Sequence, residues 1–520
     1  MEKRALLAFI LSFMVLIGWS LLFAPKGNIP EKKKILKKTT KKELRPVFLE
    51  KEKEIIVDTP LYRIRFSNIG PSIKQIQLKK YYRTAEKESG WVKLIPLEDI
   101  RPITLGIDLE EKRPLVYKAN RDFLKITSKE RTLEFRADTE DFSILKLFRF
   151  YPDSYKIDVK VEVSNLKKEK KEGAFFVKLK TVMLDHKKIK GYSHLGLVSF
   201  IKGELKKIKL KEGERKVFSG DVKWLAYETK YFISAVITNT EGILHAKRFK
   251  KGILMAYYKG GDFSLPPMGK ISRSFILYLG PKEINVLKNI GYQLESVVNF
   301  GWTDFIAKPI LYLLRFFYKY LHNYGLAIIL LSVLIKLIFW PLSKKSYESM
   351  KEMQRIQPLI ERIREKYKDD RERMNRELLN LYRTYKVNPF SGCLPIIIQI
   401  PVFFALYRVL CDAIELRHAP FILWINDLSA PDRLFRFPFQ IPFMEPPYGI
   451  PMLTLLMGAT MYIQQKMSPQ PGDPSQAKIM MLLPLVFTVM FINFPSGLVL
   501  YWLVNNILSI FQQYMTQKDR

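Results

Sequence analysis

The sequence predicts a multi-pass α-helical membrane protein with six spans, joined to an all-β sandwich domain outside the membrane. Apolar residues cluster at 5–24 and again from 302 to 515, in stretches long enough to cross a bilayer as helices. Between these clusters, from about residue 55 to 290, apolar and polar residues alternate, as they do in half-buried strands. The net charge is +35, and lysine mixed with glutamate over the alternating region indicates a solvated surface.

The first apolar stretch predicts a membrane anchor. Glu2-Lys-Arg4 precedes nineteen mostly apolar residues that run from Ala5 to Phe23. A cleaved signal peptide usually has an apolar region of about 7–15 residues and small residues at its cleavage site, whereas Leu22 stands at such a position here. We therefore expect residues 1–24 to form an uncleaved first span, with a cleaved signal as the alternative. The lysine-rich residues 25–54 are expected to be a linker.

Residues 55–294 are predicted to form the sandwich. Strict alternation means that each strand has one buried and one wet face, and turn signals such as Tyr151-Pro-Asp153 separate the runs. The clearest run alternates buried-type residues with charged ones, namely Ile157, Val159, Val161 and Val163 with Lys156, Asp158, Lys160 and Glu162. The domain contains no cysteine and therefore does not depend on disulfides. The two cysteines, Cys393 and Cys411, lie in one predicted membrane helix and are too far apart along it to pair.

Residues 295–323 predict an amphipathic helix that lies along the membrane surface. The apolar face holds Trp302, Phe305, Ile306, Pro309, Leu313, Phe316, Phe317 and Tyr320. The opposite face holds Asp304, Lys308, Arg315 and Lys319. The position directly before a predicted span favours an interfacial helix, and an ordinary core helix is the alternative.

Five further spans are predicted, at about 324–342, 391–411, 448–466, 479–494 and 497–514. In domain terms, span 2 covers 324–343, spans 3 to 6 fall within 389–515, and residues 516–520 form a tail. The intervening segment 344–388 is rich in lysine and arginine, which places it in the cytoplasm. Six spans then put both termini in the cytoplasm and residues 25–320 outside.

The cytoplasmic segment predicts a helical hairpin with its turn at Asp369-Asp370. One apolar stripe holds Met350, Met353, Ile356, Ile360 and Ile363, and the other holds Met374, Leu378, Leu381 and Tyr385. The two stripes either pack on each other or offer an adaptable methionine surface to apolar partners. The Lys/Arg face of the hairpin is suited to ribosomal RNA or anionic lipid.

Lys336 is the candidate functional residue because it lies inside an otherwise apolar run. A charge at the bilayer centre costs at least about 2.5–3.5 kcal/mol. Its long side chain either reaches the interface beyond Pro341, only five residues on, or lines a polar cavity between spans. Ser332 precedes it by four residues and shares its helix face.

Signatures of enzymes are absent from the sequence. It contains no Walker A loop, no G-x-G-x-x-G and no H-E-x-x-H, and its five histidines are scattered. We therefore expect no enzyme, no catalytic residue, no metal site, no cofactor and no small-molecule substrate. The rival function is a small-solute transporter or channel, but the internal repeats or paired broken helices of a transporter are not found in the sequence.

Several ordered motifs resemble the YidC family of membrane protein insertases, in its Gram-negative form with a large periplasmic domain. The residues that carry the resemblance are Trp340-Pro-Leu-Ser343, Lys386-Val-Asn-Pro-Phe-Ser-Gly-Cys-Leu-Pro395, Gln399-Ile-Pro401, Pro420-Phe-Ile-Leu-Trp-Ile-Asn-Asp-Leu-Ser429, Gln465-Lys-Met-Ser-Pro469 and Phe494-Pro-Ser-Gly-Leu-Val-Leu-Tyr-Trp502. The resemblance implies a protein of the bacterial inner membrane whose last five spans form the insertase core and whose β domain is periplasmic. Nascent membrane proteins, the lipid bilayer and the Sec translocon are the implied partners, with the ribosome and the signal recognition particle receptor as further candidates.

The resemblance also implies a hydrophilic groove that works without nucleotide hydrolysis, either independently of the translocon or together with it. The family has an arginine in the groove at the position of Lys336, and a lysine offers a compact point charge in place of a planar fork. The other implied groove positions are Ser332, Gln399, Tyr501 and Trp502. On the cytoplasmic hairpin, we expect Met350, Met353, Arg362 and Arg364 to contact clients or the ribosome.

Overall fold

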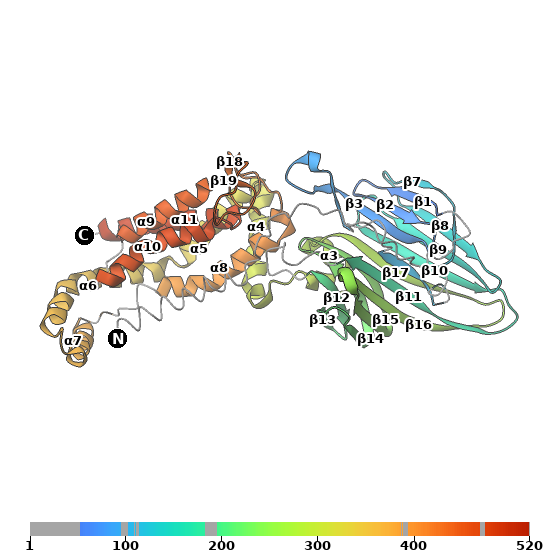
Figure 1. The fold of residues 1–520 in the computed structure, drawn as a ribbon, viewed down its shortest axis with the longest axis horizontal. Coiled ribbons are helices and arrows are strands. Elements are labelled where there is room, and N and C mark those ends of the chain that lie inside the picture. The colour runs from blue at the N-terminus through green and yellow to red at the C-terminus, as the bar shows by residue number, and fades with distance from the viewer. Residues whose placement is uncertain are drawn as a thin grey trace, which may run out of the picture. The chain divides into compact units, whose positions relative to one another are not determined.

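The computed structural model describes residues 52–94, 102–108, 110, 114–182, 195–385, 387, 394–467 and 474–518. The chain divides into a β-rich unit, Met1–Lys79 with Lys93–Gly280, and a helical unit, Lys80–Val92 with Pro281–Arg520 (Figure 1). The predicted first span, nearly all of the linker 25–54 and part of the motif 386–395 lie outside the described residues.

The described strands of the β-rich unit join into two series. The first series runs, neighbour by neighbour, through β7 (Phe123–Lys125), β1 (Glu54–Asp58), β2 (Tyr62–Ser67), β3 (Ser72–Tyr82), β5 (Ile103–Ile107), β11 (Lys171–Val182), β16 (Ile253–Leu265), β15 (Phe232–Arg248), β14 (Arg215–Glu228), β12 (Gly196–Ile201) and β13 (Glu204–Ile208). The second runs through β6 (Lys118–Ala119), β8 (Arg131–Asp138), β9 (Phe142–Phe150), β10 (Lys156–Asn165) and β17 (Lys270–Pro281). Apart from the parallel pair β1–β7, these pairings are antiparallel. A pairing of β15 with β17 joins the series, and the short β4 (Trp91–Lys93) belongs to the same network.

The core of the β-rich unit lies between the two series. On β10 the four alternate residues from Ile157 to Val163 are buried while their charged neighbours are not, as the sequence predicts. Phe66 on β2 packs against Phe135 on β8 and Phe148 on β9, with ring centroids 5.8 and 5.1 Å apart. The β-rich character of this region is therefore confirmed, and period-two burial is its physical cause.

The helical unit is built from helices that pack lengthwise. Its elements are α3 (Ile284–Ile290), α4 (Asp304–Leu321), α5 (Tyr324–Ile338), α6 (Trp340–Lys366), α7 (Arg371–Thr384), α8 (Leu394–Asp412), α9 (Met452–Met467), α10 (Pro474–Phe491) and α11 (Ser496–Lys518), with short turns η1 (Lys87–Ser89), η4 (Leu294–Val297), η5 (Gly301–Thr303) and η6 (Ile414–Leu416) and the hairpin β18 (Leu434–Phe437) and β19 (Tyr448–Ile450). Helix α11 packs against α5, α8 and α9, while α10 packs against α9 and α4 packs against α5 and α8 (Figure 1). This arrangement makes α11 the central helix of the unit.

No single described helix is both long enough and apolar enough to cross a bilayer by itself. Helices α5 and α6 meet that test only as a pair, with a bend of 62° between them. The sequence predicted one continuous span over 324–342, whereas the structure ends α5 at Ile338 and begins α6 at Trp340. The physical reason is Pro341, which suits the first turn of a new helix. The number of spans stays a prediction.

Helix α4 carries two apolar faces. Ala307, Ile310, Leu311 and Leu314 are buried. The aromatic residues Phe305, Phe316 and Tyr320 instead are 72, 54 and 65% exposed. The aromatic face predicted from the sequence is thus not the face that packs within the unit, and the position of α4 along the membrane surface stays a prediction.

The segment 344–388 does contain a helical hairpin, formed by the end of α6 and by α7. Its core holds Ile356, Ile360, Leu378 and Val387, and Met353, Ile363, Met374, Leu381 and Tyr382 pack against that core. Asp370 caps α7 by accepting a hydrogen bond from Arg373 N at 3.0 Å, which agrees with the predicted turn. Tyr385 was expected in the apolar stripe, but it is 50% exposed and Tyr382 packs in its place.

Candidate functional site

Lys336 lies on the last turn of α5, with its side chain buried between helices. It is 8% exposed, and its Nζ donates a hydrogen bond to Ser509 Oγ on α11 at 2.8 Å. Ser509 Oγ in turn donates to Asn505 O on its own helix at 2.8 Å. Within the described residues, no carboxylate forms an ion pair with Lys336. The cation is therefore held by a neutral hydroxyl at one end of the helix bundle.

Ser332 lies one turn earlier on α5 and is 1% exposed. Its Oγ donates to Ile328 O of the same helix at 2.7 Å. Hydrogen bonds of this i−4 kind satisfy a hydroxyl without a partner from another helix. The structure thus places Ser332 and Lys336 on one face, but it connects only Lys336 to a second helix.

A ladder of polar residues runs along α11 on both sides of Ser509, and sequence reasoning missed Ser509 and the two glutamines in it. Asn506 Nδ2 donates to Thr460 Oγ1 at 3.2 Å, Gln512 Nε2 to Trp340 O at 3.1 Å, and Gln513 Nε2 to Met467 O at 2.7 Å. The Oε1 atoms of both glutamines are buried and accept no hydrogen bond from the described residues. The signal in the sequence was the spacing of three or four residues between polar positions, which places them on neighbouring rows of one helix.

A second polar contact joins Gln399 and Tyr501. Gln399 Nε2 on α8 donates to the Tyr501 hydroxyl on α11 at 3.0 Å, and Tyr501 is 1% exposed. Trp502, the next residue, is half-buried in an aromatic cluster with Phe403 and Phe491, at centroid distances of 5.0 and 5.1 Å. The structure therefore brings three of the predicted groove residues together on the α8 side of α11.

The two polar contacts lie at different levels of the bundle. Tyr501 and Ser509 are eight residues apart on α11, which corresponds to about 12 Å along the helix axis. The residues just before the Gln399–Tyr501 contact on α11 are buried and apolar, namely Leu498, Val499 and Leu500. Polar residues thus accumulate along α11 from Tyr501 toward its C-terminal end, which lies beside Lys336 of α5.

Arg408, a second cation within a predicted span, has a different kind of partner. Arg408 on α8 forms an ion pair with Asp412, with Nη2 and Oδ2 3.3 Å apart, and both side chains are nearly buried. A carboxylate one turn away on the same helix therefore offsets that charge. Lys336 is distinguished from Arg408 by its neutral partner.

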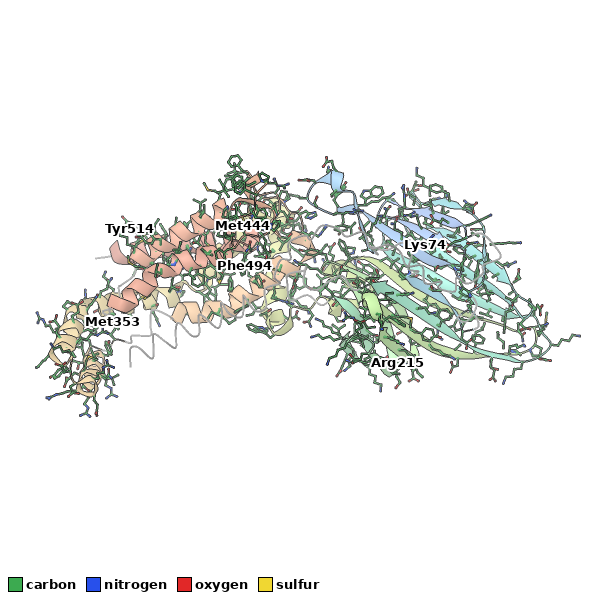
Figure 2. The ribbon with its side chains drawn as sticks, viewed as in Figure 1. Lys74, Arg215, Met353, Met444, Phe494 and Tyr514 are labelled. Atoms are coloured by element: carbon green, nitrogen blue, oxygen red, sulfur yellow. The ribbon has the colours of Figure 1, made fainter. Side chains whose placement is uncertain are left out.

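The predicted contact residues of the hairpin differ in exposure. Met353 packs against the hairpin core, and Met350 is half-buried (Figure 2 labels Met353). Arg362 is exposed and Arg364 is half-buried. Among the described residues, no group of three His, Cys, Asp or Glu side chains is placed to hold a metal ion.

Comparison with known proteins decides the family. Residues 54–313 match the family described as the YidC periplasmic domain, and residues 316–520 match the 60Kd inner membrane protein family. The membrane protein insertase YidC of Syntrophobacter fumaroxidans is 42% identical over 562 aligned positions, which cover all of both chains. The chain belongs to the YidC family of membrane protein insertases. The YidC of Syntrophus aciditrophicus is 43% identical over 90% of this chain and 86% of its own.

A solved structure of an active YidC insertase, with its first transmembrane domain resolved, also aligns with this chain. It covers 90% of this chain and 93% of its own at 19% identity, with a TM-score of 0.40. YidC insertases belong to the bacterial inner membrane and are not a class of enzymes. The family membership expected from the sequence motifs is therefore confirmed, together with the division into a periplasmic domain and a helical part.

Proposed function

We propose that this chain moves nascent membrane proteins into the bilayer through a hydrophilic groove whose charge is Lys336, without nucleotide hydrolysis. One observation supports the proposal most directly, namely that a buried ammonium group in an apolar helix is bonded only to the Ser509 hydroxyl among the described residues. An isolated charge of this kind is costly in a dry interior, and such residues usually serve function. A hydrated recess beside Lys336 removes most of that cost.

The proposed groove opens toward the cytoplasm. Six spans with both termini inside place the end of α5 and the end of α11 on the cytoplasmic side. The polar ladder of α11 runs toward that end, with Gln512 and Gln513 one turn beyond Ser509. The Oε1 atoms of both glutamines have no hydrogen-bond partner among the described residues and can accept a hydrogen bond from water. The buried apolar residues Leu498–Leu500 separate the ladder from the periplasmic end.

The groove lowers a barrier and leaves the equilibrium unchanged. Burial of an apolar client helix favours insertion by several kcal/mol, since each central Leu, Ile, Phe or Val contributes about 0.3–0.6 kcal/mol. The obstacle is the polar segment that crosses with that helix, because its charges and backbone groups are poorly solvated by lipid. Water and one positive charge at Lys336 solvate this segment, and acidic segments gain most from the charge.

The cytoplasmic hairpin is the proposed point of delivery. The apolar stripes of α6 and α7 pack against each other in the hairpin core. Met353 therefore stabilises the hairpin and offers little apolar surface to a client. The exposed arginines, of which Arg362 is one, suit the ribosome or the signal recognition particle receptor. We include the Sec translocon as a partner at the membrane, working beside an insertase that also acts independently.

The experiment compares clients that differ only in the charge of the translocated tail. In proteoliposomes, Lys336→Ala is expected to slow insertion of a single-span client with an acidic tail several-fold and to affect a neutral-tailed client less. Lys336→Arg is expected to retain insertion because the charge stays. Lys308→Ala is the matched control, since Lys308 is a lysine on α4 that pairs with Asp304 at 2.6 Å. Equal insertion of both clients by Lys336→Ala at the wild-type rate contradicts the proposal.

A further inference from the structure

The segment between α8 and α9, residues 413–451, exposes large apolar side chains to an unusual degree. We call it the outer loop. Its exposed apolar residues are Ile422 at 51%, Leu423 at 79%, Phe435 at 68%, Phe439 at 60% and Phe443 at 78%. Three of them fall at intervals of four residues in a stretch, 434–444, whose apolar residues otherwise alternate with Arg436, Gln440 and prolines. Exposed apolar side chains at such regular intervals indicate that this surface contacts an apolar environment.

The backbone of the outer loop holds these side chains outward in strained conformations. Leu423, Phe435 and Phe443 have φ angles of 55, 53 and 61°, and His418 has a φ of 58°. Bulky residues rarely adopt this left-handed region, which favours glycine. Three of the five exposed apolar residues therefore occupy conformations that the fold imposes, and such imposed strain concentrates at functional sites.

Hydrogen bonds make the outer loop rigid and tie it to the turn between α10 and α11. Arg433 donates to Pro447 O and to Ile492 O, both at 2.8 Å, so one guanidinium joins the loop to the end of α10. Asn493 Nδ2 donates to Phe443 O at 2.7 Å, and Asn493 Oδ1 accepts from Glu445 N at 2.8 Å. The exposed residues are thus presented by a fixed frame.

The outer loop lies at the same end of the helical unit as the start of α5. Asn323 Nδ2 donates to Phe421 O at 3.1 Å, and Phe421 packs so closely on Gly325 that no Cβ fits there. The end of α4 is joined to the same region by the ion pair of Arg315 with Glu415, at 3.7 Å between Nη1 and Oε1. Figure 2 shows Met444 of the loop at this end of the unit. The outer loop therefore contacts both α4 and the start of α5.

We propose that residues 434–444 of the outer loop, with Leu423, insert into the outer leaflet of the membrane and anchor the α10–α11 turn at a fixed depth. The inference rests on the proposed function for one point, namely that α8 and α9 are spans, which places the loop at the periplasmic surface. Arg436 is the only ionisable residue of this stretch, and its Nη1 forms an ion pair with Glu86 Oε1 at 3.1 Å, so the surroundings of the exposed phenylalanines carry no uncompensated charge from Arg436. Apolar tips beside a compensated ion pair match a lipid interface, where the tips enter the acyl region and the Arg436–Glu86 pair stays at the level of the headgroups.

The anchor also has a consequence for the site. Arg433 and Asn493 connect the loop to the α10–α11 turn, and α11 carries both Tyr501 and Ser509. A loop that is fixed in the outer leaflet thereby sets the depth in the membrane at which the polar residues of α11 begin. The lipid contact is a positioning device, and the charge of Lys336 does not depend on it.

The experiment measures lipid contact at single positions of the full-length protein in lipid nanodiscs. In a variant with Cys393→Ser and Cys411→Ala, an environment-sensitive fluorophore is attached through Phe443→Cys, and quenching by lipids with nitroxide in the acyl chain is recorded. We expect quenching several-fold above that at Met268→Cys, an exposed site at 65% on the β-rich unit. A fluorophore on Gln440→Cys is expected to move toward water when Phe435, Phe439 and Phe443 are all changed to serine.

Each outcome decides the proposal. Quenching at residue 443 no greater than at residue 268, in protein that still inserts a client, overturns the lipid anchor and leaves the proposed function intact. A photo-crosslinker at residue 443 that yields protein adducts in cell membranes and no lipid adducts also overturns it, because the occupant is then a protein. Strong quenching together with equal insertion of acidic and neutral clients by Lys336→Ala supports the anchor and contradicts the groove.

Discussion

Two buried lysines, one in each unit, show two opposite ways of keeping a cation inside this protein. Lys146 on β9 is fully buried, and its Nζ donates to Glu110 Oε1 at 2.9 Å and to Leu105 O at 2.7 Å. Its ammonium also lies 4.5 Å from the centre of the Tyr117 ring. Lys336 on α5 has only the hydroxyl of Ser509 as a partner among the described residues.

The difference shows which lysine is structural. Glu110 is itself fully engaged, since it also accepts hydrogen bonds from Tyr117 OH at 2.6 Å and from Ile107 N at 3.0 Å. Burial lowers the pKa of Lys146, and the neighbouring carboxylate opposes this shift. A closed network of this kind leaves no free hydrogen-bonding position for a ligand, whereas Lys336 bonds only to the Ser509 hydroxyl among the described residues, which leaves N–H groups for water or a client.

The largest expected effect follows from breaking the closed network. Lys146→Met leaves the Glu110 carboxylate buried without its cation, and we expect the free energy of unfolding to fall by about 3–5 kcal/mol. Lys336→Met removes a cation that has no buried counter-charge, so the expected change is below about 1 kcal/mol in either direction. Denaturant unfolding of the full-length protein in detergent, followed by circular dichroism, measures both.

Two further variants make that comparison specific to the ion pair. Lys160→Met removes a lysine of the neighbouring strand whose pair with Glu162 is exposed, and its expected effect is below about 1 kcal/mol. Adding Glu110→Gln to Lys146→Met is expected to recover part of the lost stability, because no charge then remains buried. Equal destabilisation by Lys146→Met and Lys160→Met contradicts the contrast.

Glu415 in the outer loop is an intermediate case, a buried carboxyl whose cation is distant. Burial raises its pKa to about 7, with Glu283 acting in the same direction and Arg315 opposing. A raised pKa means that stability is fully present below about pH 4.5 and is lost as the pH rises to about 7. The expected loss from this group is about 3 kcal/mol over that window.

Thermal unfolding of the full-length protein between pH 4.5 and 8 tests the sign. Glu415→Gln is expected to flatten the fall in melting temperature over this range, since the neutral amide does not titrate. Glu352→Gln is the matched control, because Glu352 also pairs with an arginine, Arg355, at 2.9 Å but is 48% exposed in its side chain. A fall in melting temperature that is unchanged in Glu415→Gln excludes this carboxyl as its cause.

The sequence predicts the β-rich unit well because burial there repeats with period two, as in Ile157 to Val163. It also predicts the hairpin turn, since Asp370 is a strong helix cap. It does not predict where α5 ends, because the run from Tyr324 to Pro341 reads as continuously apolar while Pro341 begins a new helix. Local pattern therefore identifies elements better than it identifies bends.

The candidate site is predicted only in part because its contacts are long-range. Lys336 is visible in the sequence as a charge in an apolar run, yet its partner Ser509 lies 173 positions away. The Lys146–Glu110 pair, 36 positions apart, escapes notice for the same reason, since each residue looks like part of a solvated strand or loop. Pairing of this kind depends on tertiary packing, which local periodicity does not encode.

The smallest expected effect separates a wet Lys336 from a dry one. Ser509→Ala removes the hydroxyl that accepts from Lys336 Nζ. With water beside the ammonium, a water molecule takes over the hydrogen bond, and the expected loss of stability is about 0.6 kcal/mol, typical of a single interhelical bond. In a dry seam the buried charge loses its acceptor outright, and the loss rises to about 3 kcal/mol or more. Ser332→Ala is the matched control, because its hydroxyl bonds only within α5. A loss at residue 509 far above that at residue 332 means that Lys336 is dry, and the hydrated groove is then wrong even though the family remains.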